Sequence, residues 1–248
     1  MSGMDAAVAC LWELAELIGS TRTVDRGLHR IDSETALSSR NGVLHASLGA
    51  DAEERVGEIV EHFEARVVPF RWHVSPTCRP RDLGERLLAH GFREVDTLAG
   101  MRSATDRRLV KPDPSVRVEP LAPGDEPAFV DVILAGMEVP ESRRAALLAN
   151  VTGPDSRQTH YAAWVDGVLV GAATAVRFPR AGFLQGATVL PTHRGRGIYR
   201  QLIQTRLTHF HQAGIAEAII TARTATSAPI CDRLGFERIS TIDVFEHD

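Results

Sequence analysis

Hydrophobic positions in the second half of the chain switch between a period of two, typical of strands, and a period near 3.6, typical of helices. Strands are predicted at 116–120, 159–165, 168–178, 182–190 and 216–221, and a final strand pair is predicted within 236–245. Helices are predicted at 125–137, 141–151 and 228–234. The longest helix starts at Gly197 and ends near Gly214, and its apolar face consists of Ile198, Leu202, Ile203, Leu207 and Phe210. Asp166-Gly167 predicts a hairpin, because a type I′ turn needs positive φ angles.

The first half of the chain predicts a similar order of elements. Strands are expected at 42–48, 67–74 and 92–101, and helices at 52–66 and 81–90. Residues 88–95 also resemble residues 233–239, since both join a helix to an aromatic strand start through glycine. An internal duplication explains both similarities, and the alternative is a coincidence at a common helix–strand junction. Two prolines in Lys111-Pro112-Asp113-Pro114 predict a linker, which gives domains at 1–114 and 115–248.

The composition excludes several classes of protein. With 248 residues, 44% hydrophobic residues and a net charge of −4, the chain suits one or two ordinary globular domains. The negative charge argues against a surface that binds nucleic acid or anionic membrane, and no apolar run reaches the ~18 residues of a spanning helix. Cys10, Cys78 and Cys231 are too few and too scattered for a disulfide framework or a zinc ribbon. We therefore expect a cytoplasmic protein without a metal.

Positive charge is concentrated in one interval of the sequence. No acidic residue occurs between Asp166 and Glu217, and the arginines of that interval are Arg177, Arg180, Arg194, Arg196, Arg200 and Arg206. Such an arginine island predicts an anionic ligand, and the alternative is a solvated arginine surface.

Residues 189–200, Val-Leu-Pro-Thr-His-Arg-Gly-Arg-Gly-Ile-Tyr-Arg, combine this charge with two glycines between a strand and a helix. Glycines let the backbone turn sharply, and the N–H groups at a helix start then form an anion site that suits a diphosphate. A nucleotide P-loop is excluded because it needs Gly-Lys-Ser or Gly-Lys-Thr. A dinucleotide fingerprint is excluded because its third glycine is missing near Arg200.

The order Arg-x-x-Gly-x-(Gly/Ala), after a strand ending in Val-x-Pro and before a helix, resembles the pyrophosphate loop of the GNAT superfamily of acyl-CoA-dependent N-acetyltransferases. Arg194 and Gly197 match this motif, whereas Tyr199 stands where Gly or Ala is usual. The hairpin before the loop and Leu234-Gly235-Phe236 after it also match. The resemblance implies an α/β (α+β) fold with two GNAT-like lobes, each a mixed, mostly antiparallel sheet flanked by helices.

By the same resemblance, acetyl-CoA is the cosubstrate, and its pantetheine arm lies in a gap between strands 182–190 and 216–221. The residues implied in cofactor binding are Val189, Leu190, Arg194, Gly195, Arg196, Gly197, Ile198, Tyr199 and Arg200. An amine attacks the thioester carbonyl directly, which requires a base for the amine and an acid for the leaving thiolate.

The candidate catalytic residues depart from the family's usual pattern. Cys231 replaces the usual tyrosine acid, and a thiol with a pKa of about 8.5 is still able to protonate a thiolate. The alternative for Cys231 is a small buried apolar residue. Thr224 replaces a frequent asparagine; other candidate acids are Ser227 and Tyr199, and candidate bases are Glu138, Glu141 and His160. Strand 182–190 offers only Gln185 and Thr188, and no carboxylate.

The first half lacks a phosphate loop of this kind. Its counterpart, Gly49-Ala50-Asp51-Ala52-Glu53-Glu54-Arg55, places three acids where a diphosphate would lie, so we expect a degenerate lobe that binds no CoA. Residues 70–76, which include Phe70 and Trp72, either line a substrate cleft or pack in the lobe's own core.

The sequence thus predicts an N-acetyltransferase that acts on an amine-bearing small molecule or a peptide amine. A non-catalytic acyl-CoA-binding protein, regulatory or sensory, is the alternative, because the usual acid and base are missing. Nucleic-acid and membrane partners are not expected. The sequence leaves open the acceptor and the choice between a monomer and a homodimer.

Overall fold

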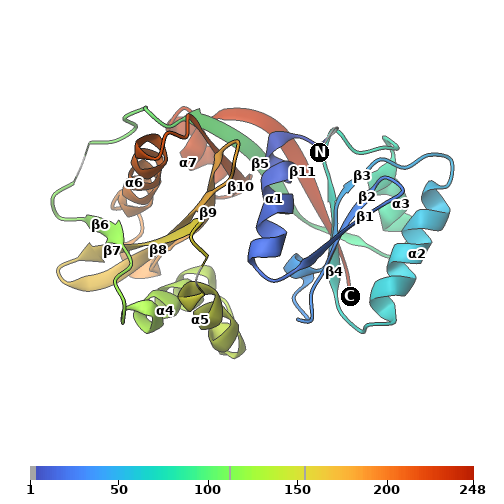
Figure 1. Ribbon diagram of the computed structural model, residues 1–248, viewed down its shortest axis with the longest axis horizontal. Coiled ribbons are helices and arrows are strands. Elements are labelled where there is room, and N and C mark those ends of the chain that lie inside the picture. Colours follow the sequence, from blue (N-terminus) through green and yellow to red (C-terminus); the bar gives the residue numbers. More distant parts are fainter. Residues whose placement is uncertain (1–3, 112, 154) are drawn as a thin grey trace. The chain divides into compact units, whose positions relative to one another are not determined.

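The computed structural model describes residues 4–111, 113–153 and 155–248 (Figure 1). The chain divides into two compact units, one of Met1–Met101 with Thr221–Asp248 and the other of Arg102–Ile220. The C-terminal segment thus belongs to the same unit as the first part of the chain. Pro112 of the predicted linker lies outside the described residues, and the division into domains at 1–114 and 115–248 stays a prediction.

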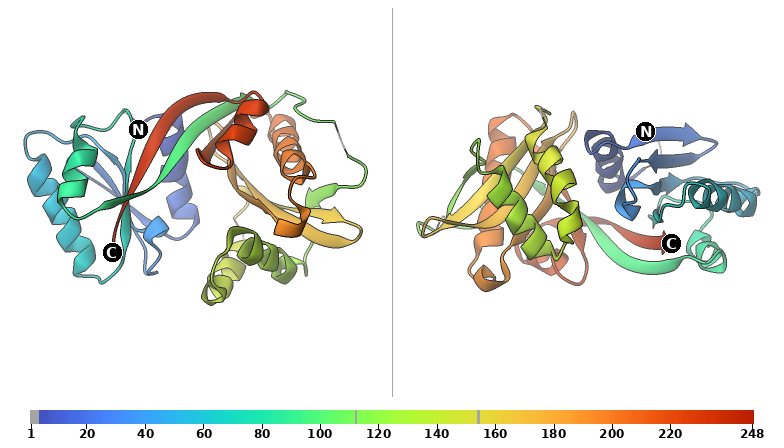
Figure 2. Two further views of the ribbon diagram at one scale, coloured as in Figure 1. Left: turned by 180° about the vertical axis from the view of Figure 1, so that it is seen from behind. Right: turned by 90° about the horizontal axis from the view of Figure 1, so that it is seen from below.

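The first unit is a sheet with helices on both of its faces (Figure 2). Its strands are β1 (Thr21–Asp25), β2 (Leu28–Asp32), β3 (Gly42–Ala46), β4 (Phe70–Val74), most of β5 (Arg93–Ala104) and β11 (Glu237–His247). Its helices are α1 (Ala6–Leu17), α2 (Ala52–Glu64), α3 (Leu83–Ala89) and α7 (Ala228–Arg233), with a 3-10 turn at Ser38–Arg40. The strands follow the order β1-β2-β3-β4-β11-β5, in which β3 and β4 are parallel.

The last strand differs from the sequence prediction. The sequence predicts a strand pair within 236–245, and the structure has the single strand β11 instead. Residues 238–241 contain no glycine, asparagine or proline, so the chain lacks the residues that supply the positive or fixed φ of a tight turn. β11 runs antiparallel to β4, from Asp243 opposite Val74 to His247 opposite Phe70.

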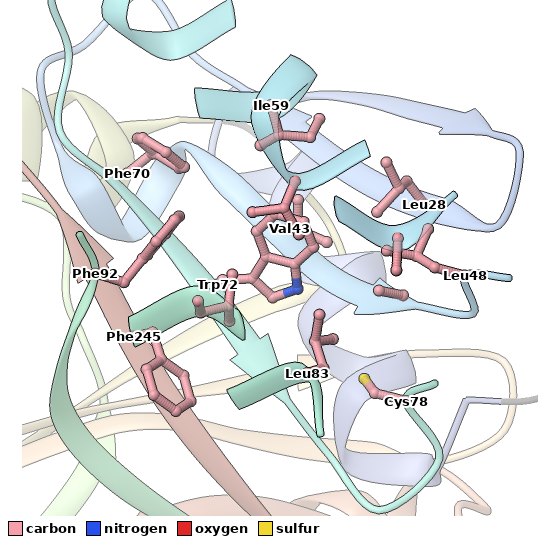
Figure 3. Close-up of a cluster of buried hydrophobic side chains, with 14 of the residues drawn as sticks. Leu28, Val43, Leu48, Ile59, Phe70, Trp72, Cys78, Leu83, Phe92 and Phe245 are labelled. Atoms are coloured by element: carbon pink, nitrogen blue, oxygen red, sulfur yellow. The ribbon is translucent and has the colours of Figure 1, made fainter. Parts of the chain in front are cut away.

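Aromatic residues of β4 form the core of the first unit (Figure 3). Trp72 has 0% of its surface exposed and Phe70 has 1%. Phe70 stacks on Phe63 of α2 with ring centroids 4.5 Å apart, and Trp72 meets Phe92 edge-on. Phe70 and Trp72 therefore pack inside their own unit, which decides between the two alternatives for these side chains.

The second unit is a sheet between two layers of helices. Its strands are β6 (Arg117–Pro120), β7 (Gln158–Val165), β8 (Val168–Arg177), β9 (Gly182–Val189) and most of β10 (Glu217–Arg223). Its helices are α4 (Glu126–Met137), α5 (Arg144–Thr152) and α6 (Ile198–Gln212), with 3-10 turns at Glu141–Arg143 and Pro191–His193. α6 covers one face of β8 and β9, and α4 covers the other with α5 beside it (Figure 1).

The pairing of these strands confirms the predicted fold class. β6, β7, β8 and β9 pair in succession as antiparallel strands, and β10 is parallel to β9. Apart from the final strand, the order of helices and strands predicted for the second half is also confirmed. The hairpin turn has the predicted geometry, with φ of 50° at Asp166 and 79° at Gly167. In the described part of the chain, no helix is long and apolar enough to cross a membrane.

Candidate active site

The edge of β9 that faces β10 is only partly paired. The parallel register joins Gly182 to Ala218 and Phe183 to Ile219, at the start of both strands. No further pair of the two strands occurs among the described residues. From Leu184 to Val189, β9 therefore presents backbone N–H and C=O groups that β10 does not use, which is a site for an extended polar chain to bind.

A β-bulge lies in the middle of this exposed edge. In the pairing of β8 with β9, Ala173 lies opposite Ala187 whereas Thr174 lies opposite Gln185. Gly186 is thus an extra residue in β9, and its φ of 32° is a conformation that side chains with a Cβ rarely adopt. A bulge bends its strand, so Gly186 marks the place where β9 changes direction.

The loop after β9 has the backbone of an anion site. Gly195 and Gly197 both adopt positive φ, 78° and 81°, and α6 begins at Ile198. In the described structure, the N–H groups of Gly195, Arg196 and Gly197 donate no backbone hydrogen bond, and that of Ile198 belongs to the first turn of a helix. A Cβ at either glycine would meet nothing within 4 Å, so the loop is open on that side.

Arg194 holds this loop in place rather than extending into it. Its Nε donates to the carbonyl oxygen of Val189 at 3.2 Å, and its Nη2 donates to that of Gly136 at 2.8 Å. Its backbone N–H donates to Pro191, which closes the preceding 3-10 turn. The guanidinium therefore ties the start of the loop to the end of β9 and to the last turn of α4.

The six arginines of the island do not share one surface. Arg206 is fully buried, and Arg177 donates to the carbonyl oxygen of Ser156. Arg196 and Arg200, which flank the two glycines and the helix start, are exposed. The six arginines therefore do not form one cluster of charge, because Arg206 falls on the apolar face of α6. An anionic ligand at the arginine island stays a prediction. Two exposed arginines remain beside the open loop.

Helix α4 approaches β9 closely on the other side of the sheet. A Cβ at Gly136 would lie 2.3 Å from Oγ1 of Thr188, so only glycine permits this approach. α4 ends at Glu138, an exposed residue in the left-handed conformation with φ of 55°. Glu141, by contrast, pairs with Arg144, and this hydrogen bond lowers the pKa of its carboxyl group. Of the two predicted carboxylate bases, Glu141 is thus engaged in an ion pair, and a role for Glu138 as the base stays a prediction.

His160 on β7 lies opposite Thr174 on β8. Thr174 in turn lies opposite Gln185 on β9, beside the bulge. Nδ1 of His160 is 2.9 Å from Oγ1 of Thr174, and burial lowers the pKa of the imidazole. The ring lines a hollow of about 280 Å³ together with Glu126 and others. Because a neutral imidazole is able to accept a proton, His160 stays a candidate base.

Cys231 belongs to the first unit, whereas the glycine loop belongs to the second. Its side chain is fully buried in α7. Thr224 donates both its N–H and its Oγ1 to the carbonyl oxygen of Thr97, at 3.0 Å each. A catalytic role for Cys231 stays a prediction. The described residues contain no group of three or more His, Cys, Asp or Glu able to hold a metal ion.

The segment that contains the half-paired strand and the glycine loop also matches a known family in sequence. Residues 131–236 match the model of the acetyltransferase (GNAT) family. They form a GNAT acetyltransferase domain. The matched segment of this GNAT domain contains the second half of α4, the exposed edge of β9, the loop and α6. No curated protein sequence matches the chain.

Solved structures extend the likeness of fold to nearly the whole chain. A GCN5-related N-acetyltransferase from Kribbella flavida aligns with a TM-score of 0.76 at 17% identity, over 98% of this chain and 96% of its own. A tandem GNAT protein from the clavulanic acid biosynthesis pathway aligns with a TM-score of 0.67 at 14% identity, over 99% and 90%. A protein of unknown function from Staphylococcus epidermidis aligns with a TM-score of 0.74 at 13% identity, over 92% and 94%.

Proposed function

We propose that this chain transfers an acetyl group from acetyl-CoA to the amine of a small molecule or peptide. The observation that carries the proposal is the loop before α6, where two glycines have positive φ and successive described N–H groups have no backbone acceptor. Such an arrangement binds a diphosphate without a metal. Exposed Arg196 and Arg200 add positive charge beside it.

The edge of β9 supports the same proposal. Its backbone groups from Leu184 to Val189 would pair with the amides of a pantetheine arm, as a strand partner does. The thioester would then lie near the bulge at Gly186, between the two helix layers. There an amine attacks the carbonyl carbon, the C–S bond breaks, and the sulfur leaves as a thiolate that takes up a proton.

The residues proposed for proton transfer are those that the sequence analysis names as candidate acids and bases. Glu138 and His160 are the proposed alternatives for accepting the amine proton, directly or through water. Cys231 is the proposed acid, with Ser227 and Tyr199 as alternatives. The leaving thiolate has a pKa close to that of a cysteine thiol, so only a weak acid is needed.

A second candidate function is binding of acyl-CoA without catalysis, in a regulatory or sensory role. The complete burial of Cys231 and the absence of a carboxylate from the sequence of β9 favour this alternative. The glycine loop fits both functions, so only turnover separates them.

Calorimetric titration with acetyl-CoA tests the loop, with Gly197→Asp as the variant. The added carboxylate faces the diphosphate and strains a residue with φ of 81°, so we expect at least a 100-fold loss of affinity. Gly214→Asp is the matched control. Gly214 also has a positive φ, 76°, and open space around it, but it lies beyond the opposite end of α6 from the loop. Equal affinity in Gly197→Asp and wild type would contradict the proposal.

Turnover then separates the two candidate functions. Release of thiol from acetyl-CoA is measured with a panel of primary amines, and acceptor-dependent release supports the transferase. Tight binding with no release above the rate without acceptor, for every amine class, would favour the binding protein.

A further inference from the structure

Arg206 is a fully buried cation that the proposed reaction does not use directly. It lies on α6, between Leu202 and Phe210 on the helix face that covers the sheet. Its Nε donates to the carbonyl oxygen of Leu202 at 3.0 Å, within its own helix. Its Nη1 donates to the carbonyl oxygens of Thr174 at 3.0 Å and Gln185 at 3.2 Å.

These two strand carbonyls belong to the residues that flank the bulge. Thr174 and Gln185 are the pair at which the register of β8 and β9 shifts, and Gly186 is the extra residue. A bulge disturbs the regular ladder and leaves backbone groups without their usual donors. Because a buried carbonyl without a donor is costly, the guanidinium compensates for the distortion that the bulge creates.

An aliphatic residue would fill this position of α6 at lower cost. Burial of a guanidinium carries a large desolvation penalty, which only well-placed hydrogen bonds offset. The neighbours of Arg206 on the same face, Leu202, Ile203 and Leu207, are all aliphatic and fully buried. An arginine among them is therefore explained by the carbonyls that it holds and not by packing.

We propose that Arg206 is a positioning residue, which fixes the bulge at Gly186 and so sets the course of the β9 edge that receives acyl-CoA. This inference rests on the proposed function. The same helix contributes to both parts of the site, because α6 begins at the glycine loop with Ile198 and reaches the bulge with Arg206. Eight residues of helix separate them by about 12 Å, so α6 holds the anion loop and the strand edge at a fixed spacing.

The first test compares acetyl-CoA affinity in Arg206→Met with that in Phe210→Leu. Phe210 is on the same buried face, but it contacts Gly182 at the start of β9 rather than the bulge. Both variants are expected to lower the melting temperature. Only Arg206→Met is expected to weaken acetyl-CoA binding, by at least tenfold, whereas Phe210→Leu stays within threefold of wild type. Equal affinity in the two variants would overturn the proposal.

Arg206→Lys is the conservative variant in case Arg206→Met does not fold. An ammonium group retains the charge but lacks the planar fork of the guanidinium. We expect an affinity between those of wild type and Arg206→Met. Wild-type affinity in Arg206→Lys would assign the effect to charge alone and contradict a positioning role.

A double-mutant cycle with Gly186→Ala locates the effect at the bulge. Alanine at φ of 32° is strained, so this variant should also weaken binding. If Arg206 acts through the bulge, the double variant loses much less affinity than the product of the two single losses. Independent, multiplicative losses would show that Arg206 acts elsewhere.

Hydrogen exchange of β9 in the absence of acetyl-CoA keeps the two proposals distinguishable. Faster exchange of residues 184–189 in Arg206→Met, and not in Phe210→Leu, supports the role at the bulge even if wild type binds no acetyl-CoA. Unchanged exchange there would contradict that role even if wild type binds acetyl-CoA tightly.

Discussion

Helices α2 and α6 occupy similar places in the element order of the two halves, and they begin in opposite ways. α6 follows Gly195 and Gly197, both with positive φ, and has no acid in its first turn. α2 follows Gly49, whose φ is not positive. It has two acids, Glu53 and Glu54, in its first turn. Glu53 moreover pairs with Arg86 and His90 of its own unit. Backbone shape and charge thus both favour an anion at α6 and disfavour one at α2.

Each of these two helices also buries one arginine, and the partners differ. Arg55 of α2, 3% exposed, pairs with the carboxylates of Asp25 and Glu58. Its hydrogen bond holds the pKa of Asp25 below the ordinary value. Arg206 of α6 binds backbone carbonyls at a bulge instead. The comparison indicates that the first unit uses its arginine to tie helix to hairpin, whereas the second uses it to shape a strand edge.

The largest effect is expected from truncating the core of the first unit. Trp72→Ala removes a fully buried indole from β4, and we expect a loss of about 3–5 kcal/mol in the free energy of unfolding. Urea denaturation followed by circular dichroism measures it. Val24→Ala is the control, because Val24 is 61% exposed on β1 of the same unit and should cost less than about 0.5 kcal/mol. Similar losses in the two variants would show that β4 lines an open surface and is not core.

Local features of the sequence predicted most of the second unit and its loop. The glycines and Pro191 near the start of α6 act through their own φ angles, so a short window of sequence is sufficient to find them. Net charge along the chain does not distinguish Arg206 from the other arginines, because it carries no information on the helix face that an arginine occupies. The available signal was the spacing of Arg206, three residues after Ile203 and four after Leu202, which places it on the apolar face of α6.

The elements that the sequence did not predict depend on distant partners. β1 is a polar edge strand with three of its five residues exposed, so it shows little of the alternation that marks a buried strand. α1 is apolar on most of its surface and gives a weak helical period. For β11 the sequence predicts strand structure but not a single strand or its partner, because β11 pairs with β4, more than 150 residues earlier in the chain.

A smaller effect is expected from His73, which lies beside Trp72 on β4. Burial, assisted by Arg71, lowers the pKa of His73 to about 4 from an ordinary 6.5. Between these two values the unfolded chain binds a proton that the folded chain does not, so stability falls as the pH decreases from 6.5 toward 4. At pH 5 this amounts to about 2 kcal/mol relative to pH 7.

His73→Gln should remove this part of the pH dependence. Urea denaturation of the variant at pH 7 and pH 5 is compared with that of wild type, and we expect the difference between the two pH values to shrink by about 2 kcal/mol. His211→Gln, at an exposed position of α6, is the control and should retain the wild-type difference. An unchanged difference in His73→Gln would mean that the imidazole ionises on β4 as freely as in solution.

The smallest effect is expected at the start of α2. Asp51→Asn, Glu53→Gln and Glu54→Gln together remove the acids near the start of α2. The ion pairs of Glu53 are exposed, so we expect the melting temperature to change by only about 1–2 °C. Calorimetry should still find one acetyl-CoA per chain, because neutral side chains do not supply two glycines with positive φ. A second site in this variant would show that charge alone separates the two helix starts, and backbone shape would then have no part in the specificity of α6.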